Sequence, residues 1–468
     1  GGRAYGGPMA HREGRSERVK ELKGARRTVA RERAVLVEVT LAGDAVGRQV
    51  HRDRLEELGR LADAAGAEVV ATATQRRRGT HPGTYVGHGK AKELGDLARE
   101  QRAHVIIFDN DLSPAQVRNL EAATETKVID RSELILDIFA SRARTNESRL
   151  QVELAQLEYQ YPRLRRMWTH LSRMEGGIGT RGPGETQLET DRRIVRRRIT
   201  ELKRRIGEID ARKEREVRSR SGMLTVGLVG YTNAGKSSIL NALTHADAYV
   251  EDKLFATLDT RTRAWTLPHR LTALVSDTVG FIRDLPHHLI ASFKATLEEA
   301  IHADLLLHIV DVSTEHAQAD VEAVLAVLAE IRCADKPQIL VLNKADLVKD
   351  PLHLDLAHRA FPGAVATSAK TGEGLDRLAG IVTERLVGPE KEIMVRASPE
   401  DGRLLAWIDH HAEVIERSMA DGELVQRIRL PERLIAEIRR LAARRVEVTT
   451  DGGKTTAANI QRDKGGPG

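Results

Sequence analysis

The residues best suited to chemistry lie in one glycine-containing loop in the middle of the chain. They are Gly230, Tyr231, Thr232, Asn233, Ala234, Gly235, Lys236 and Ser237. The loop matches the phosphate-binding pattern G-x-x-x-x-G-K-[ST] at every fixed position. Its backbone N–H groups would point at phosphate oxygens, and the N-terminus of a following helix would add positive charge. We expect Lys236 to act on the β- and γ-phosphates as a catalytic cation and the Ser237 hydroxyl to bind Mg²⁺.

The sequence around this loop predicts the elements that such a site needs. Residues 224–229 are mostly apolar and predict a short buried strand, and residues 237–243 predict the start of a helix. The alternative is a glycine-rich turn that matches the pattern by chance, and the predicted strand and helix on either side of the loop argue against it.

Three further motifs each follow an apolar run that predicts a strand. They are Asp277-Thr278-Val279-Gly280, Asn343-Lys344-Ala345-Asp346 and Ser368-Ala369-Lys370. Asp277 can hold Mg²⁺ through water, and the N–H of Gly280 can meet the γ-phosphate as a catalytic group. Asp346 can accept two hydrogen bonds from guanine, whereas adenine offers no such donor pair.

The remaining residues of these motifs complete a guanine-nucleotide site. Asn343 would tie the loops together, the Lys344 stem would lie over the base, and residues 368–370 would supply a backbone N–H to guanine O6. In this order the four motifs resemble those of the translation-factor-like GTPases, whose fold is a mostly parallel sheet flanked by helices. The resemblance implies GTP as the substrate and Mg²⁺ as the cofactor.

The segment before the Asp277 motif matches the first switch of such GTPases. It consists of Phe255, Ala256, Thr257, Leu258 and Asp259. The resemblance implies that Thr257 is a second Mg²⁺ ligand and a catalytic residue, with Thr260 and Thr262 as alternatives. Phe281 stands where Ras-like enzymes carry a glutamine that orients the attacking water, so we expect slow intrinsic hydrolysis that a partner stimulates. Asn233 matches a position that helps to bind K⁺ in several related GTPases; the alternative is a simple turn asparagine.

Composition narrows the class of protein. The chain has 468 residues and a net charge of +6, and 41% of its residues are hydrophobic. No apolar run approaches the roughly 18 residues of a membrane span, and no signal peptide is visible. The single cysteine, Cys333, excludes an internal disulfide and suits a reducing compartment. We therefore expect a cytoplasmic monomer, and the aromatic content of 3% argues against an RNA-recognition sheet that stacks bases.

The length of the chain suits three or four domains. Changes in the periodicity of its apolar residues predict a multidomain α/β protein. The expected parts are a P-loop GTPase domain, a small parallel α/β domain, a helical hairpin, a small α+β domain and two tails. The boundaries are a disordered basic tail at 1–32, the parallel α/β domain at 33–140, the antiparallel hairpin with a glycine-rich tip at 141–221, the GTPase domain at 222–388, the C-terminal α+β domain at 389–452 and a disordered tail at 453–468.

The predicted hairpin is strongly basic. Apolar residues recur every three or four positions at 150–171 and 188–209, which predicts two helical arms of about 30 Å each. Pro162 should kink the first arm or break one of its hydrogen bonds. Because a thin projecting element cannot bury much core, its basic excess favours contact with RNA phosphates over a merely solvated face. The candidate RNA-binding residues are Arg173, Gly177, Gly179, Arg181, Gly182, Arg196 and Arg197.

Two other features offer weaker signals. The long glycine-rich connection at 76–89 could bind a phosphate of a second nucleotide or of RNA, or could be a plain surface loop. His410 and His411 are adjacent in a predicted helix and so point in different directions, which is poor geometry for metal ligands.

The order of the parts resembles the HflX family of ribosome-associated GTPases over about residues 33–465. The most specific carriers are the segments 176–189, 255–259 and 277–282. The resemblance implies binding to ribosomal RNA of the large ribosomal subunit, with the hairpin tip near the peptidyl-transferase region. It also implies GTP-controlled splitting of stalled or idle ribosomes under stress, and ATP use by the N-terminal domain in some members.

Two other functions stay open at this point. One is an RNA-binding ribosome assembly or hibernation factor for which GTP hydrolysis matters little. The other is a regulatory GTPase whose effector is a protein or a membrane complex, with a hairpin that is merely solvated.

Overall fold

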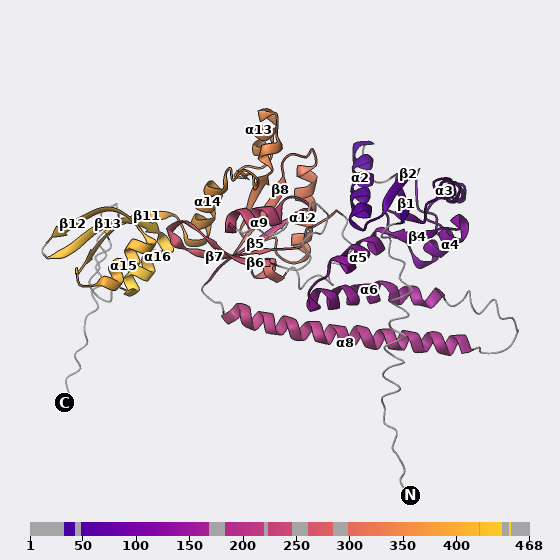
Figure 1. Cartoon of the computed structure of the whole chain (residues 1–468), viewed down its shortest axis with the longest axis horizontal. Helices are drawn as coiled ribbons and strands as arrows, with labels where there is room; N and C mark the ends of the chain where they lie inside the picture. Colours follow the sequence, from indigo (N-terminus) through magenta and orange to yellow (C-terminus); the bar gives the residue numbers. More distant parts are fainter. Residues whose placement is uncertain are drawn as a thin grey trace, which may run out of the picture. The chain divides into compact units, whose positions relative to one another are not determined.

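The computed structural model describes residues 32–42, 48–167, 183–219, 223–245, 261–283, 298–420, 422–441 and 449–450. The chain forms two compact units that meet in sequence between Ile206 and Gly207 (Figure 1). Each unit is described by itself below. The predicted first-switch residues 255–259, the hairpin tip with Arg173, Gly177, Gly179, Arg181 and Gly182, and the two terminal tails lie outside the described residues.

The first unit contains a four-stranded sheet whose order is β2-β1-β3-β4, and all its strand pairs are parallel. Strands and helices alternate, as predicted, because each parallel pair needs a crossover connection. The two short strands are buried along their whole length, which is typical of a sheet covered on both faces. The elements are β1 (Arg33–Leu41), α2 (Arg48–Ala64), β2 (Glu68–Arg77), α3 (His88–Glu100), β3 (Val105–Phe108), α4 (Pro114–Thr124), β4 (Lys127–Asp130) and α5 (Arg131–Arg142).

Two long helices follow this sheet, α6 (Asn146–Met167) and α8 (Pro183–Ser219). They run antiparallel in Figure 1, and ion pairs Arg198–Glu153 and Lys203–Glu158 join them. The predicted arm length of about 30 Å is too short for α8, whose 37 residues extend over about 55 Å. α6 runs on through Pro162 to Met167, so the proline does not end the arm.

The prediction that the hairpin is a thin element with little core is wrong for α6. Its seam residues Leu150, Leu154 and Leu157 are buried, but so are Val152 and Ala155 on another side of the helix. α6 packs against α4 and α5, and Gln156 donates to the carbonyl oxygen of Leu136. One arm of the hairpin is therefore part of the core of the N-terminal sheet.

A buried carboxylate anchors α6 to the end of β4. Asp130 is fully buried and accepts hydrogen bonds from the Tyr159 hydroxyl at 2.7 Å and from Arg163 at 3.0 Å. The backbone N–H groups of Leu112 and Glu133 also donate to it. Burial raises the pKa of the Asp130 carboxyl and the Arg163 charge opposes that shift, so the paired donors are what make the buried position tolerable.

The second unit contains a six-stranded sheet of order β10-β9-β8-β5-β7-β6, in which only β6 is antiparallel to its neighbour. The predicted P-loop GTPase fold is confirmed. Its elements are β5 (Leu224–Gly230), α9 (Lys236–Thr244), β6 (Arg261–Thr266), η1 (Pro268–Arg270), β7 (Thr272–Asp277), α11 (Glu298–His302), β8 (Leu305–Asp311), α12 (Ala317–Glu330), β9 (Gln338–Asn343), η3 (Ala345–Leu347), α13 (Pro351–Ala360), β10 (Val365–Ala366) and α14 (Leu375–Val387).

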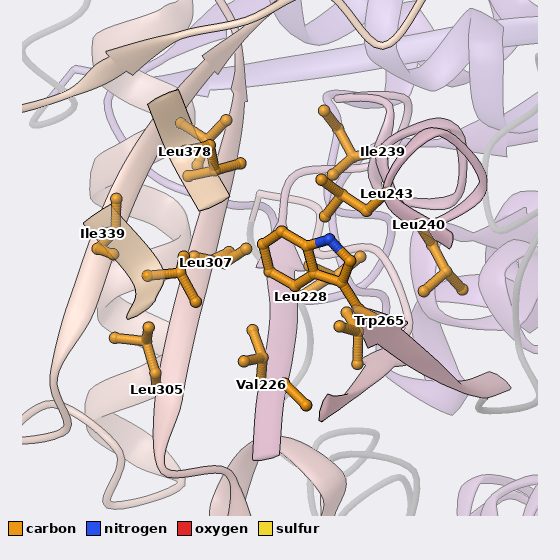
Figure 2. Packing of buried hydrophobic residues seen from close by; sticks show 14 of the residues in the cluster. Val226, Leu228, Ile239, Leu240, Leu243, Trp265, Leu305, Leu307, Ile339 and Leu378 are labelled. Atoms are coloured by element: carbon orange, nitrogen blue, oxygen red, sulfur yellow. The ribbon is translucent and has the colours of Figure 1, made fainter. Parts of the chain in front are cut away.

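Edge strand β6 was not predicted from the sequence, although it completes the core. Its Trp265 is 4% exposed and packs among Val226, Leu228, Leu240 and Leu243 (Figure 2). This cluster fixes α9, the helix that follows the phosphate loop, against the sheet.

The chain ends in a four-stranded antiparallel sheet of order β12-β13-β11-β14, as the predicted α+β pattern requires. Its core is formed by the apolar faces of α15 and α16 against β11 and β13. Gly422, at a positive φ of 78°, lies in the tight turn that joins β12 to β13. The elements are β11 (Glu390–Ala397), α15 (Gly402–His411), β12 (Glu413–Ala420), β13 (Glu423–Pro431), α16 (Glu432–Leu441) and β14 (Thr449–Thr450).

We predict that Tyr159→Phe lowers the free energy of unfolding by about 2 kcal/mol, because it removes a hydrogen bond to a buried carboxylate. Urea denaturation of the full chain measures the change. Tyr161→Phe is the matched control, since Tyr161 is partly exposed and lies beside Arg192 rather than in the Asp130 network. Equal stability of the two variants would contradict the anchor.

Candidate active site

The phosphate loop joins the end of β5 to the start of α9. Its turn depends on glycine at Gly235, which has a φ of 91°. A Cβ atom at this position would lie 2.2 Å from the side-chain nitrogen of Asn343. Asn233 also adopts a positive φ, 63°, and its side chain is exposed. The loop therefore turns tightly against Asn343 and requires glycine at 235, as the sequence pattern predicts.

Lys236, at the first position of α9, is 6% exposed. Its Nζ donates to the carbonyl oxygens of Gly230 at 3.1 Å and Tyr231 at 2.9 Å. Burial lowers the pKa of Lys236 to about 8, and the charge of Asp277 opposes this shift. The ammonium group is thus bound by two backbone carbonyl oxygens of the phosphate loop.

Ser237 and Asp277 bring two oxygen groups together, of which Ser237 is the expected direct ligand and Asp277 would act through water. The Ser237 hydroxyl donates to the carboxylate of Asp277 at 2.5 Å, and Asp277 is fully buried at the end of β7. Oxygen ligands of this kind suit Mg²⁺, which keeps several waters and binds through one or two protein groups and substrate phosphates. Among the described residues, no cluster of three or more His, Cys, Asp or Glu side chains could hold a metal by itself. The pair therefore fits a magnesium ion shared with a nucleotide.

The two base-binding motifs meet at the ends of β9 and β10. The Asn343 side chain donates to the Ala234 carbonyl oxygen at 2.9 Å and accepts from the Ala369 N–H at 3.1 Å. It therefore links the phosphate loop to residues 368–370, as predicted. The N–H of Ala369 is engaged in this link. Ser368 donates to the Asp346 carboxylate at 2.7 Å, so these two motifs are also in direct contact.

Lys344 lies in the left-handed region, with a φ of 63°, and pairs with Asp311 at 2.8 Å. This contact fixes its side chain at the end of β8. The alternative first-switch ligand Thr262 is not supported, because it lies in β6 and its hydroxyl is 2.8 Å from that of Ser276. On α8, the predicted RNA-binding residues Arg196 and Arg197 are both exposed.

The Asp277 motif packs directly on the phosphate loop. A Cβ on Gly280 would lie 2.8 Å from the Thr232 side chain and 3.0 Å from Lys236 Nζ, so only glycine fits. Phe281 is 2% exposed and packs inside the protein, and the slow intrinsic hydrolysis expected from this residue stays a prediction. Thr278 donates to the Leu228 carbonyl oxygen at 2.6 Å.

Sequence reasoning missed His308, which lies on the central strand β8. It is 1% exposed, and neither ring nitrogen has a hydrogen-bond partner among the described residues. Burial, followed by the charge of Lys236, lowers its pKa to about 4, so the ring is neutral at ordinary pH. The signal available in the sequence was a single polar residue inside the apolar run 305–310.

Comparison with known proteins identifies the family. GTPase HflX of Escherichia coli (strain K12) is 44% identical over 417 residues, which cover 88% of this chain and 96% of that protein. GTPase HflX of Caldanaerobacter subterraneus subsp. tengcongensis is 44% identical over 389 residues, which cover 82% and 88%. The chain belongs to the HflX family of GTPases.

Family descriptions match consecutive parts of this HflX-family chain. They are "GTP-binding GTPase N-terminal" at residues 52–140, "GTP-binding GTPase Middle Region" at 142–220, "50S ribosome-binding GTPase" at 225–344 and "HflX C-terminal domain" at 355–451. A crystal structure of SsGBP in complex with GDP is 24% identical, with a TM-score of 0.44, and covers 76% of this chain and 98% of its own. The GTPase HflX relatives and the family descriptions show that the substrate is GTP and that the reaction is its hydrolysis to GDP and phosphate.

We predict that the protein takes up a proton when it binds GTP at pH 8.5 and takes up none when it binds GTP at pH 7. Phosphate oxygens beside the Lys236 ammonium would raise its pKa above the value of about 8, so the bound form favours the protonated amine. GTP affinity should accordingly fall, by up to about tenfold per pH unit, above pH 8.

Calorimetry in two buffers of different ionisation enthalpy measures this uptake. Guanosine, which has no phosphate, is the control ligand and should show no difference between the buffers. Equal heats for GTP in both buffers at pH 8.5 would contradict the assignment of the titrating group.

Proposed function

We propose that this HflX-family GTPase binds the large ribosomal subunit and uses GTP to split stalled or idle ribosomes. The observation that carries the proposal is a row of exposed arginines on α8. Arg196 and Arg197 each lie about one helical turn from Arg193, and the described residues offer none of the three an ion pair. Other basic residues of α8 are different, since Arg198 and Lys203 pair with glutamates of α6.

Free guanidinium groups on a long helix suit a polyanion. They can reach phosphates of ribosomal RNA without breaking ion pairs, and each contact releases bound counterions from the RNA. The family description "50S ribosome-binding GTPase" at residues 225–344 supports this choice of partner. Among the helices that the structure describes, none is long and apolar enough to cross a membrane. We propose that the protein acts in the cytoplasm and as a monomer.

The site residues then take the following roles in hydrolysis. Lys236 neutralises charge on the β- and γ-phosphates, and the Gly280 N–H meets the γ-phosphate. Ser237 holds Mg²⁺, which neutralises phosphate charge when bound, and Asp277 acts through water. Asp346 accepts from guanine. Thr257, outside the described residues, is the proposed second ligand of Mg²⁺.

Two further elements of the site belong to the proposal. The exposed Asn233 side chain is available to a K⁺ ion beside the phosphates. Because Phe281 points inward, no side chain at position 281 orients the attacking water. This supports a slow intrinsic rate of hydrolysis and a partner that completes the site. The hairpin tip at 176–184 is the proposed wedge between the subunits.

We predict that purified large ribosomal subunits raise the rate of GTP hydrolysis at least tenfold, because the partner completes the site. The same mixtures are sedimented, and the protein should co-sediment with the subunits when bound to a GTP analogue. No stimulation and no co-sedimentation would redirect the search to a protein or membrane effector. Binding without stimulation would favour an assembly or hibernation factor.

We predict that Arg193→Ala, Arg196→Ala and Arg197→Ala together weaken subunit binding and flatten its salt dependence by about two to three units of log–log slope. The matched control replaces Arg359, Arg377 and Arg385, which are exposed on the second unit, and changes the net charge equally. GTP affinity should be the same in both variants. An equal loss of subunit binding in both would show that net charge, not the α8 row, is responsible.

A further inference from the structure

The phosphate loop and the segment after Gly280 form a short parallel ladder. The Thr232 N–H donates to the Phe281 carbonyl oxygen at 2.7 Å, and the Phe281 N–H donates to the Gly230 carbonyl oxygen at 3.1 Å. Tyr231 and Phe281 are paired as a bridge between the two segments. Two backbone hydrogen bonds alone are a weak tie between a loop and a strand end.

The Tyr231 side chain adds a third bond to this ladder. Its hydroxyl accepts from the Arg283 N–H at 2.9 Å, two residues beyond Phe281. Tyr231 is 8% exposed, Phe281 2% and Ile282 1%, so the contact is shielded from water. A buried backbone N–H needs an acceptor, and here the hydroxyl oxygen of Tyr231 supplies it.

Arg283 extends the connection to a helix. Its guanidinium donates to the Asp320 carboxylate at 3.0 Å, and both side chains are mostly buried, at 19% and 15% exposed. Asp320 lies in the first turn of α12. Tyr231, Arg283 and Asp320 therefore join the phosphate loop, the end of the Asp277 motif and α12, and we call these three residues the brace.

Gly280 directly precedes Phe281, whose backbone pairs with the phosphate loop. A Cβ atom added at Gly280 would lie 2.8 Å from the Thr232 side chain and 3.0 Å from Lys236 Nζ, so there is no room for a side chain. A movement of Arg283 away from Tyr231 would loosen the ladder at Phe281, which is the neighbour of Gly280. The position of the Gly280 N–H relative to Lys236 thus depends on the Tyr231 hydroxyl.

We propose that Tyr231 is a positioning residue for GTP hydrolysis, which acts by holding Arg283 and, through it, the Gly280 N–H. The inference rests on the proposed role of Gly280 at the γ-phosphate. The phosphate-binding pattern allows any residue at the second position of the loop. The contact with Arg283 gives a reason why this position is a tyrosine here. GDP has no γ-phosphate, so its binding should not depend on the brace.

The test is Tyr231→Phe in the full chain, assayed without ribosomes. We expect kcat for GTP hydrolysis to fall about tenfold, with KM and the GDP dissociation constant changed less than twofold. Asp320→Asn should cause a smaller fall in kcat of the same kind. The double variant should be no more than twofold slower than Tyr231→Phe alone, because both changes disable one brace.

Thr225→Val is the matched control. It also removes a hydroxyl that is hydrogen-bonded, to Asp304 at 2.8 Å, but at the other end of β5. Its kcat should be unchanged even where its melting temperature falls as far as that of Tyr231→Phe. An unchanged kcat in Tyr231→Phe would overturn the inference, and so would a loss confined to GTP and GDP affinity. Neither result bears on ribosome binding, which the subunit experiment tests separately.

Discussion

The buried ammonium group of Lys236 is the constraint on which the rest of the nucleotide site depends. An uncompensated charge in a dry interior costs several kcal/mol, so the surrounding backbone must offer oxygens. Gly230 and Tyr231 do so with their carbonyl groups, and Asp277 adds a negative charge. The turn that brings these carbonyls to Nζ requires glycine at 230, where a Cβ would lie 2.3 Å from the Ile309 carbonyl oxygen. Glycine at this position is thus a steric requirement of the turn that surrounds the Lys236 ammonium.

The features of the site that could be predicted are those set by residues close together in the sequence. The phosphate loop, the Asp277 motif and the base motifs are local patterns that end predicted strands, and parallel strands bring their carboxyl ends to one edge. The order of motifs therefore predicted that Asn343 ties the loops together, and in the structure it does so through Ala234 and Ala369. The roles of the candidate residues toward GTP and RNA stay predictions.

Contacts set by register rather than by local pattern were not predictable. Strand β6 has charged residues at alternating positions, and from the sequence we did not predict it as a strand. In the structure, its Trp265 fills the space beside α9. The Tyr231 hydroxyl meets the Arg283 N–H only because the loop and the strand end pair in one register. α6 was mistaken for a free arm since a heptad seam reports one face of a helix, whereas Val152 and Ala155 are buried on another.

The connection between β6 and β7 shows how the GTP site and the C-terminal sheet belong to one mechanical unit. His269 and Arg270 both adopt left-handed backbone conformations, with φ of 58° and 53°, each at a cost of about 1 kcal/mol or more. This geometry is maintained by contacts on the C-terminal side. His269 lies 2.7 Å from Glu390, and Arg270 donates to the His410 ring at 2.9 Å.

Leu271, the next residue, packs against the hydrophobic cores of both sheets. β7 begins there and ends at Asp277, which receives the Ser237 hydrogen bond. A strand of six residues in the middle of a packed sheet is stiff along its axis, because sliding it would break the ladders on both of its sides. Any displacement of Asp277 along the strand must therefore either move the strained turn with it or break the contacts that keep His269 and Arg270 in place. β7 therefore connects the end of the GTPase sheet that carries Asp277 to the turn that contacts the C-terminal sheet.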